Sequence, residues 1–575
     1  MSERPSNPSK TIITTLNAKY IHTNLAIRLL YQLNKNRVEH LYWKEFTIKQ
    51  PIQDIVNSLM DFDQVAFSCY IWNIIPILEC VKQLKQRNPR IRILLGGPEV
   101  SYDAESIFNN NAVDAVCYDE GEQPFSEWIQ NSQPLSQIPG IYWKSKTGII
   151  KNPPAPKTPV ECLAALQPYA DDDVTELPNK VLYIETSRGC PYKCEFCLAS
   201  LDNKIRYLPE TYIFNTLLFL IKHGKTIKFL DRTFNLKKEF TLKVFEFILK
   251  HHRPGQTFQF EITSDILHPD VISFIQQRVP PGLLRFEIGI QSIHAESNRA
   301  VGRFQNFEKT RKVILQIKEH VILHLDLIAG LPHERFQDVL TGIDTVMALQ
   351  PDELQLGVLK FLKGTPLREY QQYNYRFMPQ PPYTLISSDF ISATELVDLQ
   401  RIEWALDTLW NGHKMPHWIR YMSQQHSISR VFLLFSQRMH QASKTLHYQM
   451  QDLFKTALAL LQELTPNDPV AQSLLALDYY AYFKLKPSPM VRLPLRDSEK
   501  KHHCRMAGIQ GHFGSYLVIP FDLDYTEWST RQVVKPASQI LIFEYKGQEK
   551  AKLRSYEPKT MEVYILFSDC SYCSW

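Results

Sequence analysis

Short apolar runs alternate with helical patterns through the first 125 residues of the chain. The runs are bounded by turn-forming residues, which is typical of buried strands. The predicted strands are 11–16, 64–69, 91–95 and 115–118, and the predicted helices are 24–34 and 74–86. This rhythm predicts an α/β fold for residues 1–145, a Rossmann-like domain with an open parallel sheet wound on both faces. Its ligands would bind beyond the carboxyl ends of the strands.

A proline-rich segment separates this domain from a second alternating region. Residues 146–180 hold prolines at 153, 154, 156, 159 and 168, a density typical of a linker. Strand patterns then recur at 181–186, 226–230, 258–263, 284–290, 323–328 and 353–359, with helical patterns between them such as 212–223, 238–251 and 307–320. Six such units predict a partial (β/α)6 barrel over 181–375, with a site at the carboxyl ends of its strands.

The last third of the chain follows another pattern. Helical periodicity dominates residues 387–480, and β-like runs follow at 515–520, 539–545 and 561–567. We therefore expect a mainly helical C-terminal domain with a small β element over 376–575. No motif in this region indicates its chemistry.

Composition narrows the classes of function. The chain has 575 residues, 44% hydrophobic and 22% charged, with a net charge of +5. This balance is ordinary for a globular protein and argues against a dedicated nucleic-acid binder. The first ten residues lack the apolar core of a secretion signal, and no apolar run approaches the roughly 20 residues that span a bilayer. We expect a cytoplasmic protein with no membrane partner and with mostly reduced cysteines.

Three of the ten cysteines stand together, and their spacing predicts a metal site. Cys190, Cys194 and Cys197 follow the first strand of the predicted barrel. Three thiolates on a [4Fe–4S] cube leave one iron open for a substrate or cofactor. The alternative is a zinc site, which usually takes a fourth Cys or His at matching spacing. The next 50 residues offer only His223.

The Cys-x-x-x-Cys-x-x-Cys segment, with Phe196 before its last cysteine, resembles the radical S-adenosylmethionine (SAM) superfamily. In that family the open iron binds the amino and carboxylate groups of SAM. One electron from the cluster then cleaves the sulfonium C–S bond to give a 5′-deoxyadenosyl radical. The protein holds the reacting atoms together and excludes water.

The same resemblance implies SAM-binding residues at successive strand ends. Asp231 takes the place of the family's Gly-Gly-Glu acceptor, whose glycines are missing here. Residues 289–292, Gly-Ile-Gln-Ser, look like the stretch near the ribose and carboxylate, and 326–332 would wrap the adenosine. The implied set is Phe196, Asp231, Glu261, Ser264, Glu287, Gln291, Ser292, Gly330 and Leu331. Each polar group could instead cap a strand or begin a helix.

An α/β domain before such a barrel resembles the cobalamin-binding members of the superfamily. The implied cobalamin-binding residues are Asn17, His22, Ser68, Gly96, Gly97, Glu120 and Gly121. Many cobalamin domains carry Asp-x-His-x-x-Gly, whereas Tyr20 and Leu25 stand at the Asp and Gly positions here. Without a carboxylate to orient its ring, His22 lacks the usual support of a cobalt ligand. A packed or capping histidine is the alternative.

Residues 17–22, the Asp-Arg-Thr-Phe-Asn segment and the long tail resemble a bacterial subgroup of cobalamin-binding radical SAM proteins with a C-terminal domain of unknown function. The resemblance implies methylation of an unactivated carbon or phosphorus centre, with electrons from a flavodoxin or ferredoxin. The alternatives are a radical oxidoreductase or cyclase, with or without cobalamin, and a non-catalytic iron–sulfur sensor. Cys570 and Cys573 near the C-terminus could hold a second metal, reach the active site as a redox or proton donor, or belong to a disordered tail.

Overall fold

The computed structural model describes residues 9–110, 112–442, 448–483, 487–547, 551–556 and 563–566. The chain folds as two compact units. The first comprises Met1–Arg335 with Val358–Ala393, and the second comprises Phe336–Gly357 with Thr394–Trp575. Cys570 and Cys573 lie outside the described residues. No described helix is long and apolar enough to cross a membrane.

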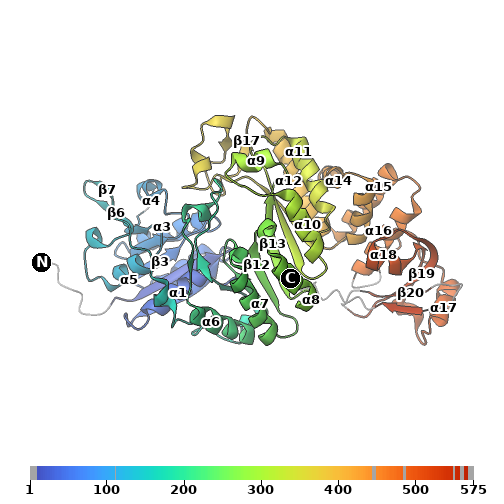
Figure 1. Cartoon of the computed structure of the whole chain (residues 1–575), viewed down its shortest axis with the longest axis horizontal. Helices are drawn as coiled ribbons and strands as arrows, with labels where there is room; N and C mark the ends of the chain where they lie inside the picture. Colours follow the sequence, from blue (N-terminus) through green and yellow to red (C-terminus); the bar gives the residue numbers. More distant parts are fainter. Residues whose placement is uncertain are drawn as a thin grey trace. The chain divides into compact units, whose positions relative to one another are not determined.

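The first unit begins with the predicted open sheet (Figure 1). Its strands pair in the order β2-β1-β3-β4-β5-β6-β7, parallel from β2 to β5 and antiparallel through β6 and β7. The bounds are β1 Thr11–Asn17, β2 Leu41–Thr47, β3 Gln64–Ser68, β4 Arg92–Gly96, β5 Ala115–Cys117, β6 Ile141–Ser145 and β7 Gly148–Lys151. The sheet thus extends into residues predicted to be a linker.

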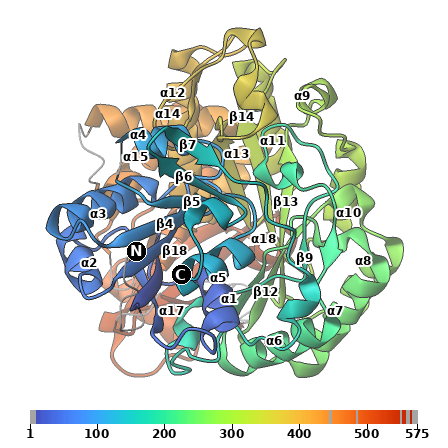
Figure 2. The same ribbon diagram turned by 90° about the vertical axis from the view of Figure 1, so that its left-hand side faces the viewer.

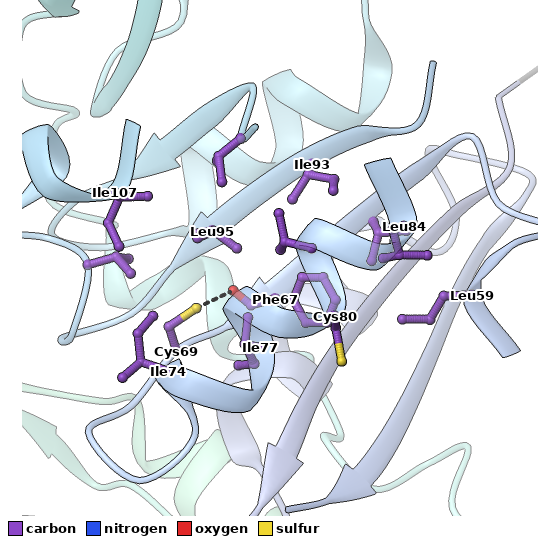
Figure 3. Packing of buried hydrophobic residues seen from close by; sticks show 14 of the residues in the cluster. Leu59, Phe67, Cys69, Ile74, Ile77, Cys80, Leu84, Ile93, Leu95 and Ile107 are labelled. Atoms are coloured by element: carbon purple, nitrogen blue, oxygen red, sulfur yellow. Dashed lines mark hydrogen bonds between the residues drawn. The ribbon is translucent and has the colours of Figure 1, made fainter. Parts of the chain in front are cut away.

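Helices cover both faces of this sheet, as the pattern predicts. On one face α2 (Ile52–Leu59), α3 (Ile74–Arg87) and α4 (Ala104–Asn110) pack on strand residues such as Phe67 and Leu95 (Figure 3). On the other face lie α1 (Leu25–Asn34) and α5 (Glu122–Gln130), whose Trp128 is fully buried. Strands with apolar side chains on both faces explain the continuous hydrophobic runs in the sequence.

The segment after the sheet is anchored by buried ion pairs. Arg28 of α1 has a side chain only 3% exposed and contacts Asp172 at 2.6 Å and Glu45 at 2.7 Å. Tyr169 is fully buried, and its hydroxyl donates to the carbonyl oxygen of Tyr183 on the next strand. These contacts hold residues 169–172 against the front domain.

A second parallel sheet follows, in the order β14-β13-β12-β11-β8 within the first unit. Its strands are β8 Val181–Ile184, β11 Thr226–Phe229, β12 Thr257–Ile262, β13 Leu284–Gln291 and β14 Ile322–Ala329. The helices α6 Glu210–His223, α7 Lys238–His251, α8 Pro269–Arg278, α9 Ala295–Ala300 and α10 Phe307–Ile317 lie between them in the chain. Figure 2 shows α6, α7 and α8 following one another around the outside of the strands.

The two faces of this sheet differ in polarity. On β12–β14 every second residue is buried and apolar, such as Phe260, Ile288 and Leu325. The intervening residues are half-buried and mostly polar, such as Glu261 and Glu287. Because strand side chains alternate between faces, the apolar set packs under the helices and the polar set lines the interior.

The second unit is mainly helical. It contains α11 Phe336–Met347, α12 Ala393–Leu406, a π-helix Asp407–Asn411, α13 Pro416–Gln425, α14 Ile428–Ala442, α15 Met450–Leu464, α16 Pro469–Tyr482, α17 Asp497–Met506 and α18 Tyr525–Arg531. An antiparallel sheet is formed by β18 Tyr516–Leu523, β19 Pro536–Glu544, β20 Lys552–Tyr556 and β21 Val563–Leu566. A helical region with a small β element is therefore confirmed. The predicted sixth barrel strand, β15 (Glu353–Val358), spans the division between the units.

Candidate functional site

The cysteine loop is fixed by backbone contacts to the residues that follow it. Gly189 has φ +93°, and a Cβ there would lie 2.5 Å from the carbonyl oxygen of Lys204. Only glycine fits this close approach without strain. The backbone N–H of Cys190 donates to the carbonyl oxygen of Asp202 at 2.8 Å. The Ser200 hydroxyl is within hydrogen-bonding distance of the carbonyl oxygens of Cys194 and Cys197.

All three thiols face one cavity of about 270 Å³. The predicted residues that line it are Cys190, Cys194, Cys197, Phe196, Glu261, Glu287 and Gln291. They come from the loop after β8 and from the carboxyl ends of β12 and β13. Segments about 100 residues apart in the sequence therefore form one site, at the end of the sheet where parallel α/β folds bind ligands.

A cation lies beside one of the three thiols. Burial raises the pKa of Cys190 and Cys194, and the guanidinium of Arg303 acts against this at Cys194. The Nη1 atom of Arg303 lies 3.7 Å from the Cys194 Sγ atom. Because metal binding requires thiolates, a nearby cation offsets part of the charge that a cluster brings.

Carboxylates from adjacent strands form one wall of the cavity. Glu261 of β12 and Glu287 of β13 are direct neighbours in the sheet. Lys228 contacts Glu287 at 2.8 Å, and Arg232 lies 3.6 Å from Glu261. Burial raises the pKa of Glu261, and the Arg232 guanidinium lowers it. Such a wall can accept hydrogen bonds from ammonium or hydroxyl groups.

A further carboxylate on this wall is held by a histidine. His324 Nε2 lies 3.0 Å from Asp326 Oδ1, and its Nδ1 lies 2.7 Å from the Nη2 atom of Arg285. Arginine can only donate, so Nδ1 accepts and Nε2 carries the hydrogen that points to Asp326. Asp326 is thereby oriented at the cavity lining.

One buried acceptor in the cavity has no protein partner. The Oε1 atom of Gln291 is buried without a hydrogen bond among the described residues, and Gln291 lines the cavity. Its φ of +67° coincides with a shift of register between β13 and β14. An unpaired buried amide oxygen costs about 1–3 kcal/mol, so a ligand donor is expected there. The three thiols and this acceptor fit a [4Fe–4S] cluster with SAM.

A single bound metal ion would need several ligand side chains that converge on one point. No group of three or more His, Cys, Asp or Glu side chains within the described ranges is arranged to hold one metal ion. A cube distributes its thiolates over different irons, so its ligands need not meet at one point.

Several predicted SAM-binding residues lie outside the cavity lining. Ser264 is fully buried and its hydroxyl bonds Thr310, while the Ser292 hydroxyl donates to Glu334 at 2.6 Å. Gly330 and Leu331 follow β14 and do not line the cavity. The structure supplies Arg232, Thr233, Tyr192 and Arg303 to the lining instead. Arg303 stands 12 residues after β13, beyond α9, and no local sequence pattern marks it.

Asp231 also supports the loop rather than lining the cavity. Its carboxylate is 1% exposed and accepts the backbone N–H of Thr186 and the hydroxyls of Thr186 and Ser187, at 2.6–3.0 Å. Burial nevertheless raises its pKa to about 6. Asp231 thus joins the end of β11 to the start of the cysteine loop.

Replacing Asp231 with asparagine should change how stability depends on pH. The folded-state pKa lies above the ordinary 3.8, so the associated stability is present below pH 4 and is lost as pH rises through 6. Relative to Asp231→Asn, the wild type should lose roughly 2 kcal/mol of unfolding free energy between pH 4 and pH 7. Urea unfolding at several pH values measures this.

The exposed Asp270 provides the control. Lys238 lowers the pKa of Asp270. Relative to Asp270→Asn, the wild type should therefore not lose unfolding free energy as the pH rises from 4 to 7. Equal pH profiles for wild type and Asp231→Asn would contradict the raised pKa.

The carboxyl edge of the front sheet has the features of a binding edge for a large ligand. Gly97 has φ +106°, and a Cβ there would lie 2.5 Å from the Cys69 carbonyl oxygen. Ser68 ends β3, and its carbonyl oxygen accepts from Thr15 and Asn73. Beyond it Tyr70 and Trp72 stack with ring centroids 4.4 Å apart, and Trp72 is 47% exposed. An exposed indole stacked on a half-buried phenol, beside close-packed backbone, suits a flat macrocycle.

His22 contacts the barrel. Its Nδ1 lies 2.8 Å from the hydroxyl of Tyr183 on β8, and Asn17 donates to its carbonyl oxygen. Burial lowers the pKa of His22, which favours the neutral ring at pH 7. The ring of His22 therefore contacts a phenol and not a carboxylate.

Glu120 joins the front domain to the cysteine loop. Its carboxylate pairs with Arg206 and accepts the backbone N–H of Thr158, and Arg188 lies 3.7 Å away. Gly121 packs near Cys117, and Gly96 does likewise. Glu120 is thus already engaged by cations from the barrel.

Comparisons with known proteins agree with this architecture. The B12 binding domain model matches residues 11–129, the radical SAM superfamily model matches 184–345, and a protein family of unknown function, DUF4080, matches 371–567. The chain thus combines a B12 binding domain, a radical SAM domain and a DUF4080 domain. These domains imply a [4Fe–4S] cluster, SAM and cobalamin.

Individual relatives are distant. The cobalamin-dependent radical SAM methyltransferase TokK of Streptomyces tokunonensis is 23% identical, over 58% of this chain and 52% of its own. A 2-(S-pantetheinyl)-carbapenam-3-carboxylate methyltransferase of Streptantibioticus cattleyicolor is 20% identical, over 75% and 70%. The chain therefore spans about half the length of one and 70% of the other.

Among solved structures, the cobalamin-dependent SAM radical enzyme OxsB with aqua-cobalamin bound matches with TM-score 0.57 at 15% identity, covering 81% of this chain and 80% of that one. The methyltransferase TsrM from Kitasatospora setae matches with TM-score 0.51 at 14% identity, covering 62% and 74%. At this identity the likeness concerns the fold.

Proposed function

We propose that this protein is a cobalamin-dependent radical SAM methyltransferase. The observation that carries the proposal is the cavity shared by three cysteine thiols and the polar ends of β12–β14, in one compact unit with a B12-binding domain. When bound, the cluster, SAM and cobalamin would together supply a reducing electron, a 5′-deoxyadenosyl radical and a methyl group. The relatives named as methyltransferases support this reading.

The protein's own residues would bind and orient these groups. Cys190, Cys194 and Cys197 would hold the cluster, with Arg303 offsetting its charge. Glu261 and the unpaired Gln291 amide oxygen would accept hydrogen bonds from SAM. The apolar face of β12–β14 is packed under the helices, and this packing keeps water from reaching the cavity through the sheet.

The central test is anaerobic reconstitution with iron, sulfide and cobalamin, followed by dithionite reduction in the presence of SAM. We expect 5′-deoxyadenosine to form, and S-adenosylhomocysteine to accumulate beside it when a methyl acceptor is present. Formation of 5′-deoxyadenosine without S-adenosylhomocysteine would favour a radical oxidoreductase or cyclase. Neither product from a fully formed cluster would favour a sensor.

We also propose that the front domain binds cobalamin over the edge formed by Ser68, Gly97 and Trp72. Trp72→Ala should lower cobalamin retention about tenfold, because loss of one aromatic packing contact costs roughly 1–1.5 kcal/mol. Cobalamin remaining after desalting, measured by absorbance, checks this. Tyr42→Ala is the control, because Tyr42 is also an exposed aromatic but lies at the amino end of β2, away from this edge. Equal retention by wild type and Trp72→Ala would contradict the proposal.

The cluster needs a one-electron reductant. We propose that a flavodoxin or ferredoxin of the cytoplasm supplies it, as the resemblance to the superfamily implies.

A further inference from the structure

We infer that an exposed surface beside the cysteine loop, formed by Lys193, Arg299 and Phe304 and called here the loop patch, docks a small acidic one-electron carrier protein. This inference rests on the proposed function. It adds the place where the reducing partner binds and the kind of charge that the partner presents.

The loop patch joins two segments that are far apart in the sequence. The backbone N–H of Glu195 donates to the carbonyl oxygen of Val301 at 2.9 Å. Gly302 lies against the carbonyl oxygen of Lys193, so close that a Cβ there would be 2.5 Å away. The cysteine loop and the turn after α9 therefore form one continuous surface.

The exposed side chains of this surface are one aromatic ring and two cations. Phe304 is 74% exposed, more than any other large apolar side chain in the described part of the chain. Lys193 and Arg299 are both exposed. Neither head group makes an ion pair within the described ranges. An exposed phenyl ring on the same surface as two cations without ion pairs is typical of an interaction site rather than of a solvated face.

The acidic groups nearby are engaged elsewhere. The Glu195 carboxylate accepts the Tyr370 hydroxyl, and Glu308 pairs with Arg311 at 3.0 Å. Glu296 lies 3.7 Å from His333. Lys193 and Arg299 make no ion pair among the described residues, so their charges remain available to attract an anionic partner.

The loop patch adjoins the residues that would hold the cluster. Arg303, the neighbour of Phe304, places its guanidinium 3.7 Å from the Cys194 thiol. Lys193 is bonded in sequence to Cys194 itself. A carrier bound here would have its redox group close to the cluster ligands. In the transfer, the carrier loses one electron and the iron–sulfur cluster gains one, with no further reactant.

The occupant is therefore an acidic flavoprotein or iron–sulfur protein. A nucleic acid would also be anionic, but the two cations and single ring do not form a groove that tracks a phosphate backbone. Dithionite is a small molecule and needs no docking surface. Comparing cluster reduction by the carrier protein with cluster reduction by dithionite therefore distinguishes a loss of docking from damage to the cluster.

The experiment uses the reconstituted full chain and the double variant Lys193→Glu/Arg299→Glu. The control is Lys250→Glu, which reverses an exposed charge in the last turn of α7, at the opposite end of the strands from the cysteine loop. Two quantities are measured for each protein. The first is the Kd for a bacterial flavodoxin, with its dependence on salt. The second is the rate of cluster reduction, followed by loss of visible absorbance, with dithionite and with flavodoxin hydroquinone.

We expect the double variant to bind flavodoxin at least about tenfold more weakly than wild type, with a smaller salt dependence, because rim charges act mainly on association. Its reduction by flavodoxin should slow in proportion, while reduction by dithionite stays at the wild-type rate. Phe304→Ala should weaken binding without changing the salt dependence. Lys250→Glu should match wild type throughout.

Unchanged flavodoxin affinity in the double variant would overturn the inference. A parallel loss of dithionite reduction would overturn it too, since that points to damage of the cysteine loop. Failure of the proposed function looks different, because the cluster would then be reduced and flavodoxin bound without formation of 5′-deoxyadenosine.

Discussion

Cys194→Ala should abolish formation of 5′-deoxyadenosine, lowering the rate by at least about 10³-fold, or roughly 4 kcal/mol of barrier. Cys194 is 5% exposed, and its thiol lies on the cavity beside the other two cysteines. Loss of one of three protein ligands should also lower the iron content and the visible absorbance of the reconstituted protein. Product analysis by chromatography and iron determination measure both effects.

The matched control is Cys162→Ala, which removes an exposed cysteine outside the cavity. It should keep wild-type iron content and wild-type product formation. A Cys194→Ala protein that still forms 5′-deoxyadenosine at the wild-type rate would refute the assignment of the cluster.

Arg28→Met should destabilise the first unit by about 3–5 kcal/mol, because it leaves buried carboxylates without their cation. Arg28 is the shared partner of Glu45 and Asp172, whose side chains are 15% and 9% exposed. Methionine retains packing against Trp43, over which the guanidinium lies at 4.5 Å. The loss can therefore be ascribed to charge rather than to a cavity. Urea unfolding gives the change.

Lys35→Met provides the comparison. Lys35 pairs with Asp171, the neighbour of Asp172, but its side chain is 28% exposed and that of Asp171 is 39% exposed. A pair this accessible should contribute less than about 1 kcal/mol. Equal losses in the two variants would show that burial of the Arg28 pairs is not what stabilises residues 169–172.

Much of the fold was predictable, because it depends on local patterns. The strands β1, β3, β4 and β5 were located within about one residue of their bounds, since continuous apolar runs between turns admit few other structures. The strand β2 was not predicted, although Leu41 and Phe46 are buried. It has only one strand neighbour, β1, and its mixed Tyr-Trp-Lys-Glu composition weakens the apolar signal.

The site was predictable to different degrees. The cysteine spacing alone pointed to the three thiols, and of the residues predicted at strand ends, Glu261, Glu287 and Gln291 line the same cavity. The same reasoning cannot separate them from Ser264 and Ser292, which also follow strands but bond Thr310 and Glu334. Those partners lie more than 40 residues away in the sequence.

The sequence by itself determined the order of domains, the cysteine motif and the polar face of β12–β14, since each depends on residue type and short-range periodicity. Tertiary structure alone decided that Arg303 approaches Cys194, that Asp231 supports the loop, and that a phenol rather than a carboxylate faces His22. These contacts join residues 44 to 161 positions apart. Their formation depends on how strands and loops pack, which no local pattern encodes.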